Sequence, residues 1–284
     1  IKKKCDFVIL AVSIIRHVIT EEIRKSFVSR KPIIISRGNC CMTEKVLYEE
    51  LCPAEFQERL QACPVAYLPL GTLEWHGPHL PLGADGIQSQ ELFIQVARRI
   101  GGIVLPKLFL GPDRFYRDPE KELYGMDICT GGTIVPYEMQ QLPGSAYWMS
   151  DEEYCRMILR IGANLSRAGF TILAAHGHGP SIRQFAALKE ELRLTCGLAG
   201  VTAFDFVEDE RLRFQNDHAA ANETSITMAV RPELVQLERI QSGREQPVAI
   251  AGSDPRTEAS REYGMEIMET NVDAMCRGIE KLLK

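Results

Sequence analysis

A dense group of acidic and histidine residues follows one short apolar segment of the chain. Residues 65–70 are mostly apolar and stop at a glycine, which predicts a short buried strand. Glu74, His76, His79 and Asp85 follow closely, among glycines and prolines that predict an irregular loop. Carboxylate oxygens and imidazole nitrogens together suit zinc, manganese or iron. The segment therefore predicts a metal site in a loop at the end of a strand.

The spacing within this loop supports a shared site. Glu74 and His76 are two residues apart, so in an extended segment their side chains point the same way. Asp85 follows a proline-rich turn and can return to the same place. The alternative is that these are ordinary polar groups of a surface loop, satisfied by hydrogen bonds. His79 in particular is expected to be structural, with its hydrogen bonds inside the loop.

Two further polar clusters follow predicted strands later in the chain. Five of the six histidines lie in the three clusters. Each cluster follows its strand, so in a parallel sheet all three gather at one edge, where open α/β sheets bind ligands. The supply of donors matches a two-metal site, in which one carboxylate often bridges the ions. The later clusters are His176 and His178 after residues 170–175, and Asp217, His218 and Glu223 after residues 201–207.

Strands alternate with helices along most of the chain. This alternation predicts a single α/β domain with a mostly parallel sheet covered on both faces. Residues 112–128 are polar and are expected to form a loop over the edge of the sheet. If the apolar stretch 226–230 forms the first turns of a helix, Glu223 lies at its amino end. The predicted strands are 65–70, 103–105, 170–175 and 201–207, and the predicted helices are 51–62, about 88–100, 150–167, 181–194 and about 258–282.

Composition excludes several classes of partner. The 284 residues are 45% hydrophobic and carry a net charge of −5, with a pI of about 5.8. No basic stripe is present, so nucleic acid is not expected as a partner. The nine cysteines are odd in number and contain no C-x-x-C pair, which favours reduced thiols in the cytoplasm over a disulfide framework.

The first 41 residues differ from the rest of the chain. They have a basic start and an apolar run at 7–15 that is far shorter than the ~20 residues needed to span a bilayer. From Met42 the sequence is typical of a cytoplasmic amino terminus. We expect residues 1–41 to be an extension outside the core fold and 42–284 to form the enzymatic domain; a short membrane anchor is the alternative. Intact-mass measurement of the natively expressed protein tests this expectation.

Three motifs resemble those of the creatininase (creatinine amidohydrolase) family. They read LPLGTLEWHGPHLPLGADG at 68–86, AAHGHGP at 174–180 and DHAAANETS at 217–225. The family's first motif usually reads P-x-G-x-x-E-Q-H-G-x-H-L-P-x-x-x-D, and this chain keeps it with Trp75 in place of glutamine. The resemblance runs from about Met42 to the carboxyl terminus. It implies a three-layer α/β/α sandwich that assembles as a homo-hexamer.

The resemblance also implies a role for each polar residue. Two divalent ions, zinc or manganese with iron possible, would be bound with Asp85 as the bridge. His218 would polarise the substrate carbonyl and stabilise the oxyanion, and Asp217 would carry a proton to the leaving nitrogen. His176 would be either a support or an extra ligand, and Trp75 and Thr133 would contact the substrate or the ligands. The ligands implied by the resemblance are Glu74, His76, Asp85, His178 and Glu223.

The function implied is hydrolysis by a metal-activated water that opens a small polar cyclic amide. The middle family motif usually reads N-G-H-G-G-N, and creatininase itself has tyrosine and glutamate after this histidine. Here Gly179 and Pro180 follow His178, so the resemblance does not predict creatinine as the substrate. Hydrolysis of a formamide, or of an oxidised cyclitol or sugar ring, is the alternative at the same metal site. A non-catalytic metal-binding protein is the alternative from another class.

Overall fold

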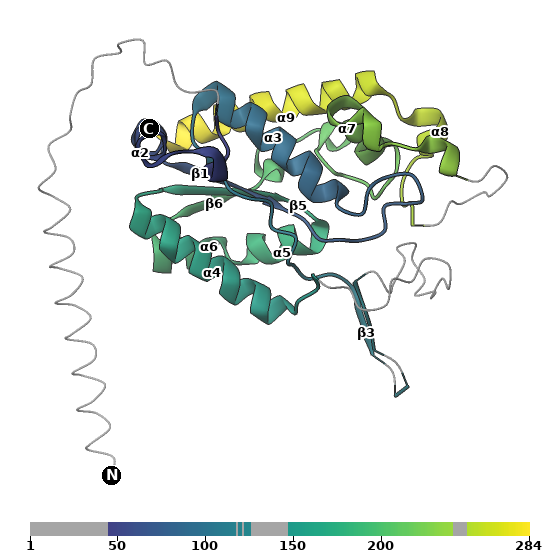
Figure 1. Cartoon of the computed structure of the whole chain (residues 1–284), viewed down its shortest axis with the longest axis horizontal. Coiled ribbons are helices and arrows are strands. Elements are labelled where there is room, and N and C mark those ends of the chain that lie inside the picture. The colour runs from purple at the N-terminus through teal and green to yellow at the C-terminus, as the bar shows by residue number, and fades with distance from the viewer. Residues whose placement is uncertain (1–44, 118, 121, 126–146, 241–248) are drawn as a thin grey trace, which may run out of the picture. The chain divides into compact units, whose positions relative to one another are not determined.

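The computed structural model describes residues 45–117, 119–120, 122–125, 147–240 and 249–284. The extension predicted at 1–41 and Thr133 lie outside these residues. In the described part, helices cover both faces of a central sheet, which gives three layers (Figure 1). The predicted α/β/α architecture is therefore confirmed.

The central sheet has four parallel strands in the order β2-β1-β5-β6. The two inner strands are buried along their whole length, as predicted for the third strand of the sequence. The strands are β1 (Val65–Leu70), β2 (Ile103–Val104), β5 (Ile172–Gly177) and β6 (Ala199–Val201).

The prediction of a strand at 201–207 is wrong, because β6 ends where that strand was expected to begin. A single 3-10 turn, Ala203–Asp205, follows. Its geometry is fixed by a capping box in which the Thr202 N–H donates to Asp205 Oδ2 at 2.6 Å. This local hydrogen bond competes with extension of the strand.

The two faces of β1 belong to two separate hydrophobic cores. Val65 and Tyr67 pack with one core, and Ala66 and Leu68 pack with the other, as the alternation of side chains in a strand requires. The first core is completed by α3 (Ala84–Ile100), α7 (Ala221–Val230) and α9 (Arg261–Leu282). The second is completed by α4 (Asp151–Ala168) and α5 (Gly179–Ala187).

Helix α4 begins and ends where the sequence predicts. The Glu153 N–H donates to the Ser150 hydroxyl, and the Glu153 carboxylate accepts the Ser150 N–H, which is a capping box. The helix predicted at 181–194 is instead divided into α5, α6 (Lys189–Glu191) and a π-helical turn at Leu192–Cys196. The remaining elements are α2 (Pro53–Ala62), α8 (Pro255–Glu258) and 3-10 turns at Tyr48–Glu50, Glu210–Leu212, Pro232–Leu234 and Leu237–Arg239.

Two local predictions near the first motif are corrected. Helix α3 begins at Ala84 rather than near 88, so Asp85 lies in the first turn of a helix and not in a loop. A carboxylate at that position is stabilised by the positive end of the helix dipole. The segment expected to be a polar loop contains a hairpin of β3 (Phe115–Arg117) and β4 (Glu122–Tyr124), paired antiparallel.

Aromatic side chains hold this hairpin against the segment that leads into α4. Trp148 stacks on Phe115 with ring centroids 5.6 Å apart, and lies 4.9 Å from the ring of Tyr124. Phe115 is directly opposite Tyr124 in the hairpin. The aromatic residues Phe115, Tyr116 and Tyr124 favour strands, which the polar composition of the segment obscured.

The chain leaves β1 and β5 at adjacent points on one edge of the sheet. Leu70 is paired with Gly177, and β1 leads towards β2 on one side while β5 leads towards β6 on the other. This is the switch point at which open α/β sheets bind ligands. Gly177 has a φ of +147°, and a Cβ there would lie 1.7 Å from the carbonyl oxygen of Leu70. Only glycine lets the two strands end this close together.

No helix in the described residues is both long enough and apolar enough to cross a bilayer. The cysteines for which the structure gives a state are free thiols: Cys52, Cys63, Cys155, Cys196 and Cys276.

Candidate metal centre

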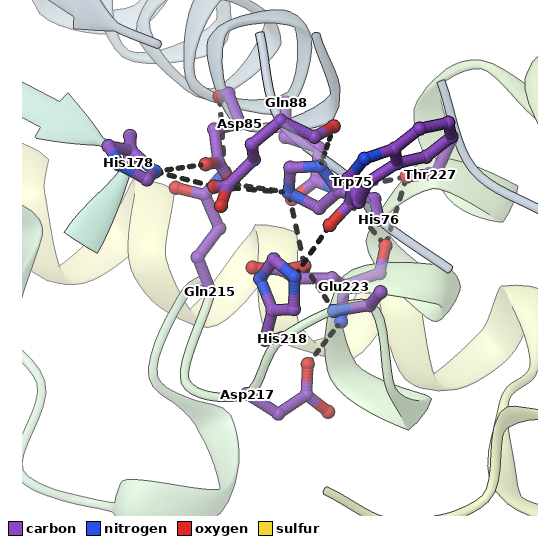
Figure 2. A network of polar contacts seen from close by, with 12 residues as sticks. Trp75, His76, Asp85, Gln88, His178, Gln215, Asp217, His218, Glu223 and Thr227 are labelled. Carbon is purple, nitrogen blue, oxygen red and sulfur yellow. Dashed lines mark hydrogen bonds and ion pairs between the residues drawn. The ribbon is translucent and has the colours of Figure 1, made fainter. Parts of the chain in front are cut away.

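Five residues predicted as metal ligands meet at the carboxyl ends of β1 and β5. Glu74 and His76 come from the loop after β1, Asp85 from the first turn of α3, His178 from the turn between β5 and α5, and Glu223 from the first turn of α7. All five are buried, with exposed fractions between 0% for His76 and 7% for Glu74. Figure 2 shows four of these side chains, those of His76, Asp85, His178 and Glu223, converging from separate elements.

Asp85 lies between the two histidines and contacts one with each carboxylate oxygen. Its Oδ1 is 3.2 Å from Nε2 of His76, and its Oδ2 is 3.1 Å from Nδ1 of His178. Gln215 holds this orientation, because its amide N–H donates to the Asp85 carbonyl oxygen at 3.1 Å and to Oδ1 at 3.3 Å. The two oxygens of one carboxylate therefore face two different imidazoles.

The other two carboxylates complete two sets of donors. Glu74 Oε1 is 2.5 Å from His178 Nδ1, and Glu223 Oε2 is 3.7 Å from His76 Nε2. The donor atoms of Glu74, Asp85 and His178 lie within 4.8 Å of one another, and so do those of His76, Asp85 and Glu223. Asp85 belongs to both sets.

The nearby carboxylates raise the pKa values of the His76 and His178 imidazoles. Burial alone would lower the pKa of His76, but the adjacent carboxylates of Asp85, Glu74 and Glu223 raise it to about 10. Burial opposes protonation of His178 in the same way, and Glu74 and Asp85 raise its pKa well above the usual value. Both imidazoles therefore carry a proton at neutral pH when no cation is present.

Two of the three carboxylates resist ionisation in this environment, whereas for Asp85 burial is outweighed by the adjacent imidazoles of His76 and His178, which hold its pKa well below its usual value. Burial raises the pKa of Glu74 to about 7, and burial together with the charge of Asp85 raises the pKa of Glu223 well above its usual value. Three carboxylates buried in one cluster need positive charge, and two imidazolium groups supply only part of it. Nitrogen and oxygen donors at these separations fit divalent ions of the zinc and manganese type.

Glu223 is fixed by its position in the first turn of α7. The Ala219 N–H donates to Glu223 Oε2 at 2.6 Å, and the Gln88 side chain donates to the Glu223 carbonyl oxygen at 3.1 Å. The segment 226–230 is helical, so the conditional prediction that Glu223 lies at the amino end of a helix is confirmed.

Asp217 caps the same helix. Its carboxylate accepts the N–H of Asn222 at 2.7 Å and the N–H of Glu223 at 3.1 Å. Burial raises the pKa of Asp217 to about 6, although these backbone hydrogen bonds act to lower it. Asp217 also lines the cavity beside the donor cluster, so its carboxylate borders the site while both of its oxygens are used by α7.

His218 enters the cavity with one nitrogen already engaged. Its Nε2 lies 2.7 Å from the carbonyl oxygen of Trp75, which can only accept, so Nε2 carries the proton and donates it. Burial and the charge of His76 lower the pKa of His218 to about 3, so the ring is neutral and Nδ1 keeps a lone pair. Its ring lies 4.8 Å from that of His76, and Glu74, His76 and His218 form a third group of close donors.

His176 and His79 lie outside these groups of donors. His176 is the next-to-last residue of β5 rather than a loop residue, and its ring packs between Phe204 and Phe214. It faces the same core as Ile172 and Ala174, because alternate residues of a strand point the same way. His79 hydrogen-bonds Thr224 of α7 at 2.9 Å, so the prediction that it bonds within its own loop is wrong, while this bond supports a structural role.

Trp75 contributes its main chain to the site. Its carbonyl oxygen orients His218, while its half-buried side chain is not among the described residues that line the cavity.

Sequence reasoning missed Gln215 and Asp113. Gln215 orients Asp85 and has a left-handed backbone with a φ of +55°, a strain that is characteristic of functional loops. Asp113 places Oδ1 3.7 Å from Nε2 of His178. Both come from segments with no regular pattern. The one available signal was that Asp113 lies shortly after Gly111, and Gln215 had no such signal.

The cluster opens into a cavity of about 420 Å³, the size of a small-molecule site. Asp113, Arg114, Asp151 and Arg183 form part of its wall together with the donor residues. A solvent-connected cavity beside buried donors provides both room for a substrate and a route for water.

A family model now decides the relationship of this chain to known proteins. The Creatininase model, described as creatinine amidohydrolase, matches residues 49–279. The chain belongs to the creatininase family. It is therefore a hydrolase of that family, as its motifs predict.

Curated relatives within the creatininase family have several activities in their names. The chain is 27% identical to creatinine amidohydrolase of Pseudomonas putida over 70% of this chain and 77% of that protein. It is 25% identical to a mycofactocin precursor peptide peptidase of Mycobacterium ulcerans over 66% of each chain. It is 23% identical to 3-dehydro-scyllo-inosose hydrolase of Thermotoga maritima, of which it covers 58%.

Solved creatininase structures share the fold. A creatininase crystal structure aligns with a TM-score of 0.61 at 23% identity, over 83% of this chain and 97% of that chain. A creatininase structure named as the Mn form aligns with a TM-score of 0.59, and a mutant of the Zn–Zn type with 0.60. At these identities the likeness establishes the fold of the described domain.

Proposed function

We propose that this protein hydrolyses a C–N bond in a small polar cyclic amide, using two divalent ions held by the cluster. The observation that supports this most is the position of Asp85, whose two oxygens face His76 and His178 in two overlapping sets of donors. A shared carboxylate is the usual bridge of a two-metal hydrolytic site.

The proposed ligands fall into two groups. Glu74, Asp85 and His178 would hold one ion, and His76, Asp85 and Glu223 the other. Zinc or manganese is proposed, with iron possible, because mixed imidazole and carboxylate donors suit these ions. The relatives named as Mn and Zn–Zn forms of creatininase support the first two.

Bound divalent ions would supply a water nucleophile of lowered pKa and polarise the substrate carbonyl. The chain's own contribution is proton movement and orientation. His218 is neutral and has a free lone pair on Nδ1, so it can accept a proton from the attacking water and deliver it to the leaving nitrogen. The family resemblance implies a donor role for His218 towards the oxyanion, and the hydrogen bond to Trp75 favours the proton-transfer role instead.

Asp217 is proposed to position the ligand Glu223 rather than to take part in the chemical step. Its two oxygens accept N–H groups of α7, and this fixes Glu223 at the edge of the cluster. A direct proton shuttle, expected from the resemblance, remains the alternative, because burial raises the pKa of Asp217 to about 6.

The second candidate is hydrolysis of an oxidised cyclitol or sugar ring. It is favoured by the relative named 3-dehydro-scyllo-inosose hydrolase and by Gly179 and Pro180, which begin α5 after His178. A formamide is a further candidate at the same site. The cavity of about 420 Å³ accommodates any of these small polar substrates.

The test combines metal analysis with a substrate panel. Purified protein should contain about two equivalents of zinc or manganese, and Asp85→Ala should lose both together with turnover. His76→Ala should lose mainly one. The panel should contain cyclic amides, formamides and keto-cyclitols. Full metal content in Asp85→Ala would rule out the bridge, and stoichiometric metal without turnover on the whole panel would favour a non-catalytic metal-binding protein.

We also propose a cytoplasmic homo-hexamer with neither nucleic acid nor membrane as a partner. The family resemblance supports the hexamer, and the negative net charge and free thiols support the rest. Light scattering at micromolar concentration tests the assembly, and a monomer there would rule it out without affecting the proposed site.

A further inference from the structure

One nitrogen of His178 has no hydrogen-bond partner among the described residues. Nδ1 faces Glu74 and Asp85 at 2.5 and 3.1 Å, which is the side of the proposed ion. Nε2 points the other way, is buried and is unsatisfied. If Nδ1 gives its lone pair to a metal ion, Nε2 must carry the ring proton, and a buried N–H needs an acceptor.

A carboxylate lies at the correct place to accept that proton. Asp113 Oδ1 is 3.7 Å from Nε2 of His178, and the Asp113 side chain is only 6% exposed. Asp113 belongs to none of the groups of close metal donors in the described chain, so it borders the cluster without joining it. The separation is longer than a hydrogen bond, and a small movement of the imidazole on metal binding would close it.

Asp113 is held by the segment that leads into the β3–β4 hairpin. Its carboxylate accepts the N–H of Arg114 at 2.6 Å, and its carbonyl oxygen accepts the indole N–H of Trp148 at 3.5 Å. Trp148 in turn packs on the aromatic residues of the hairpin. Hydrogen bonds to the carboxylate and to the main chain of Asp113 therefore hold this residue beside the cluster.

We propose that Asp113 is a positioning residue for the metal ligand His178. It accepts the Nε2 proton, fixes the tautomer in which Nδ1 is free to bind, and sets the orientation of the ring. This inference rests on the proposed two-metal site and adds a residue to it. Carboxylates that accept the second N–H of a ligating histidine raise its basicity, and their loss typically lowers metal affinity ~10–100-fold.

The test is a titration of metal-free protein with Mn²⁺ and, separately, with Zn²⁺ against a competing chelator. Asp113→Ala should weaken one of the two metal equivalents ~10–100-fold and leave the other unchanged. Asp113→Asn should weaken it less, because the amide oxygen can still accept the Nε2 proton. Asp151→Asn is the matched control: it removes a carboxylate from the same cavity wall, and no ion pair joins Asp151 to His178 in the described structure.

Visible absorption of the Co²⁺-loaded protein distinguishes a positioning role of Asp113 from a general loss of folding stability. With Co²⁺ in place of the native ion, Asp113→Ala should change the visible absorption of one site while the thermal midpoint of the metal-free protein stays close to that of the wild type. Equal affinities in Asp113→Ala and wild type would overturn the proposal, and so would an equal loss in Asp151→Asn. Wild-type protein that binds no metal would instead refute the proposed function itself.

Discussion

The hydrogen bond between His218 and the carbonyl oxygen of Trp75 determines what this histidine can do. It uses the single N–H of the neutral ring, so in the resting enzyme the remaining nitrogen can only accept a proton, which it can then pass to the leaving nitrogen. Sequence reasoning identified the residue but not its tautomer, because its partner is a main-chain carbonyl far away in the sequence.

His218→Ala should therefore bind its full complement of metal and turn over on the order of 10²–10⁴-fold more slowly. The proton-transfer group is lost, while Glu74, Asp85, His178, His76 and Glu223 remain. Elemental analysis and steady-state kinetics on the same preparation provide the measurement. Loss of one metal equivalent would show that His218 is a ligand, in agreement with its place in the third group of donors.

The residues that the sequence predicted and those it missed differ in a physical way. Glu74, His76, Asp85, His178 and Glu223 follow strands or begin helices, so the rule for parallel sheets brings them together. Asp113 and Gln215 act through a ring nitrogen or a carboxylate of another residue. Such contacts depend on side-chain orientation across distant segments, about which spacing in the sequence says nothing.

At the scale of elements, helix α7 carries one proposed ligand and is capped by Asp217. The Asp217 carboxylate accepts two backbone N–H groups of α7, one of them that of Glu223. These two hydrogen bonds stabilise the amino end of the helix and also fix the position of Glu223. The same carboxylate also borders the cavity. Its capping role and its possible proton-shuttle role can be separated by substitution.

Asp217→Asn should keep part of the activity, because its single amide oxygen still accepts one of the two backbone N–H groups of α7, while its NH2 group cannot accept the other. Asp217→Ala should lose about 1 kcal/mol of stability together with metal affinity, since the cap is gone. Denaturant melts and metal titrations of both variants test this. An Asp217→Asn protein that is stable and metal-loaded but inactive would establish the proton shuttle.

Strand β5 can end beside β1 only because residue 177 is glycine. Gly177→Ala would place a Cβ 1.7 Å from the carbonyl oxygen of Leu70, at a φ that alanine rarely adopts. We expect a loss of more than about 3 kcal/mol, beyond most single substitutions. Gly179→Ala is the control, because a Cβ there meets no atom within 4 Å. Equal denaturation midpoints of the two variants would contradict this account.

The elements themselves were predictable to differing degrees. Strands β1 and β5 and helix α4 follow from an apolar run or a capping box. Strand β6 was misplaced because the apolar residues from Val201 to Val207 suit a 3-10 turn as well as a strand once Asp205 caps the turn. The β3–β4 hairpin was missed because charged residues flank its few aromatic residues.

At the scale of the whole molecule, the metal-free cluster stores protons that bound metal must displace. The pKa of His76 is about 10 and that of His178 is also raised, so both rings are protonated at pH 7 in the absence of a cation. A metal ion binds only the neutral ring. Metal affinity must therefore rise with pH and fall as the solution becomes more acidic.

Binding of two ions at pH 7 should release about two protons from the imidazoles, and further protons from Glu74 and Glu223, whose pKa values are also raised. Calorimetric titration in buffers of different ionisation enthalpy gives the total directly. His76→Gln should release about one proton fewer. Release of no protons by the wild type would mean that the rings are already neutral and that the carboxylates do not raise their pKa values.

The proposed ligands run from Glu74 to Glu223 and come from the ends of two strands and the starts of two helices. An ion that joins them closes a long stretch of the chain on itself, much as a disulfide does. Ligands that bind only the folded state stabilise it by about 4 kcal/mol at 1,000 times their dissociation constant. The free metal concentration in the surrounding medium would then determine the resistance of this protein to thermal unfolding and proteolysis, independently of its turnover of any substrate.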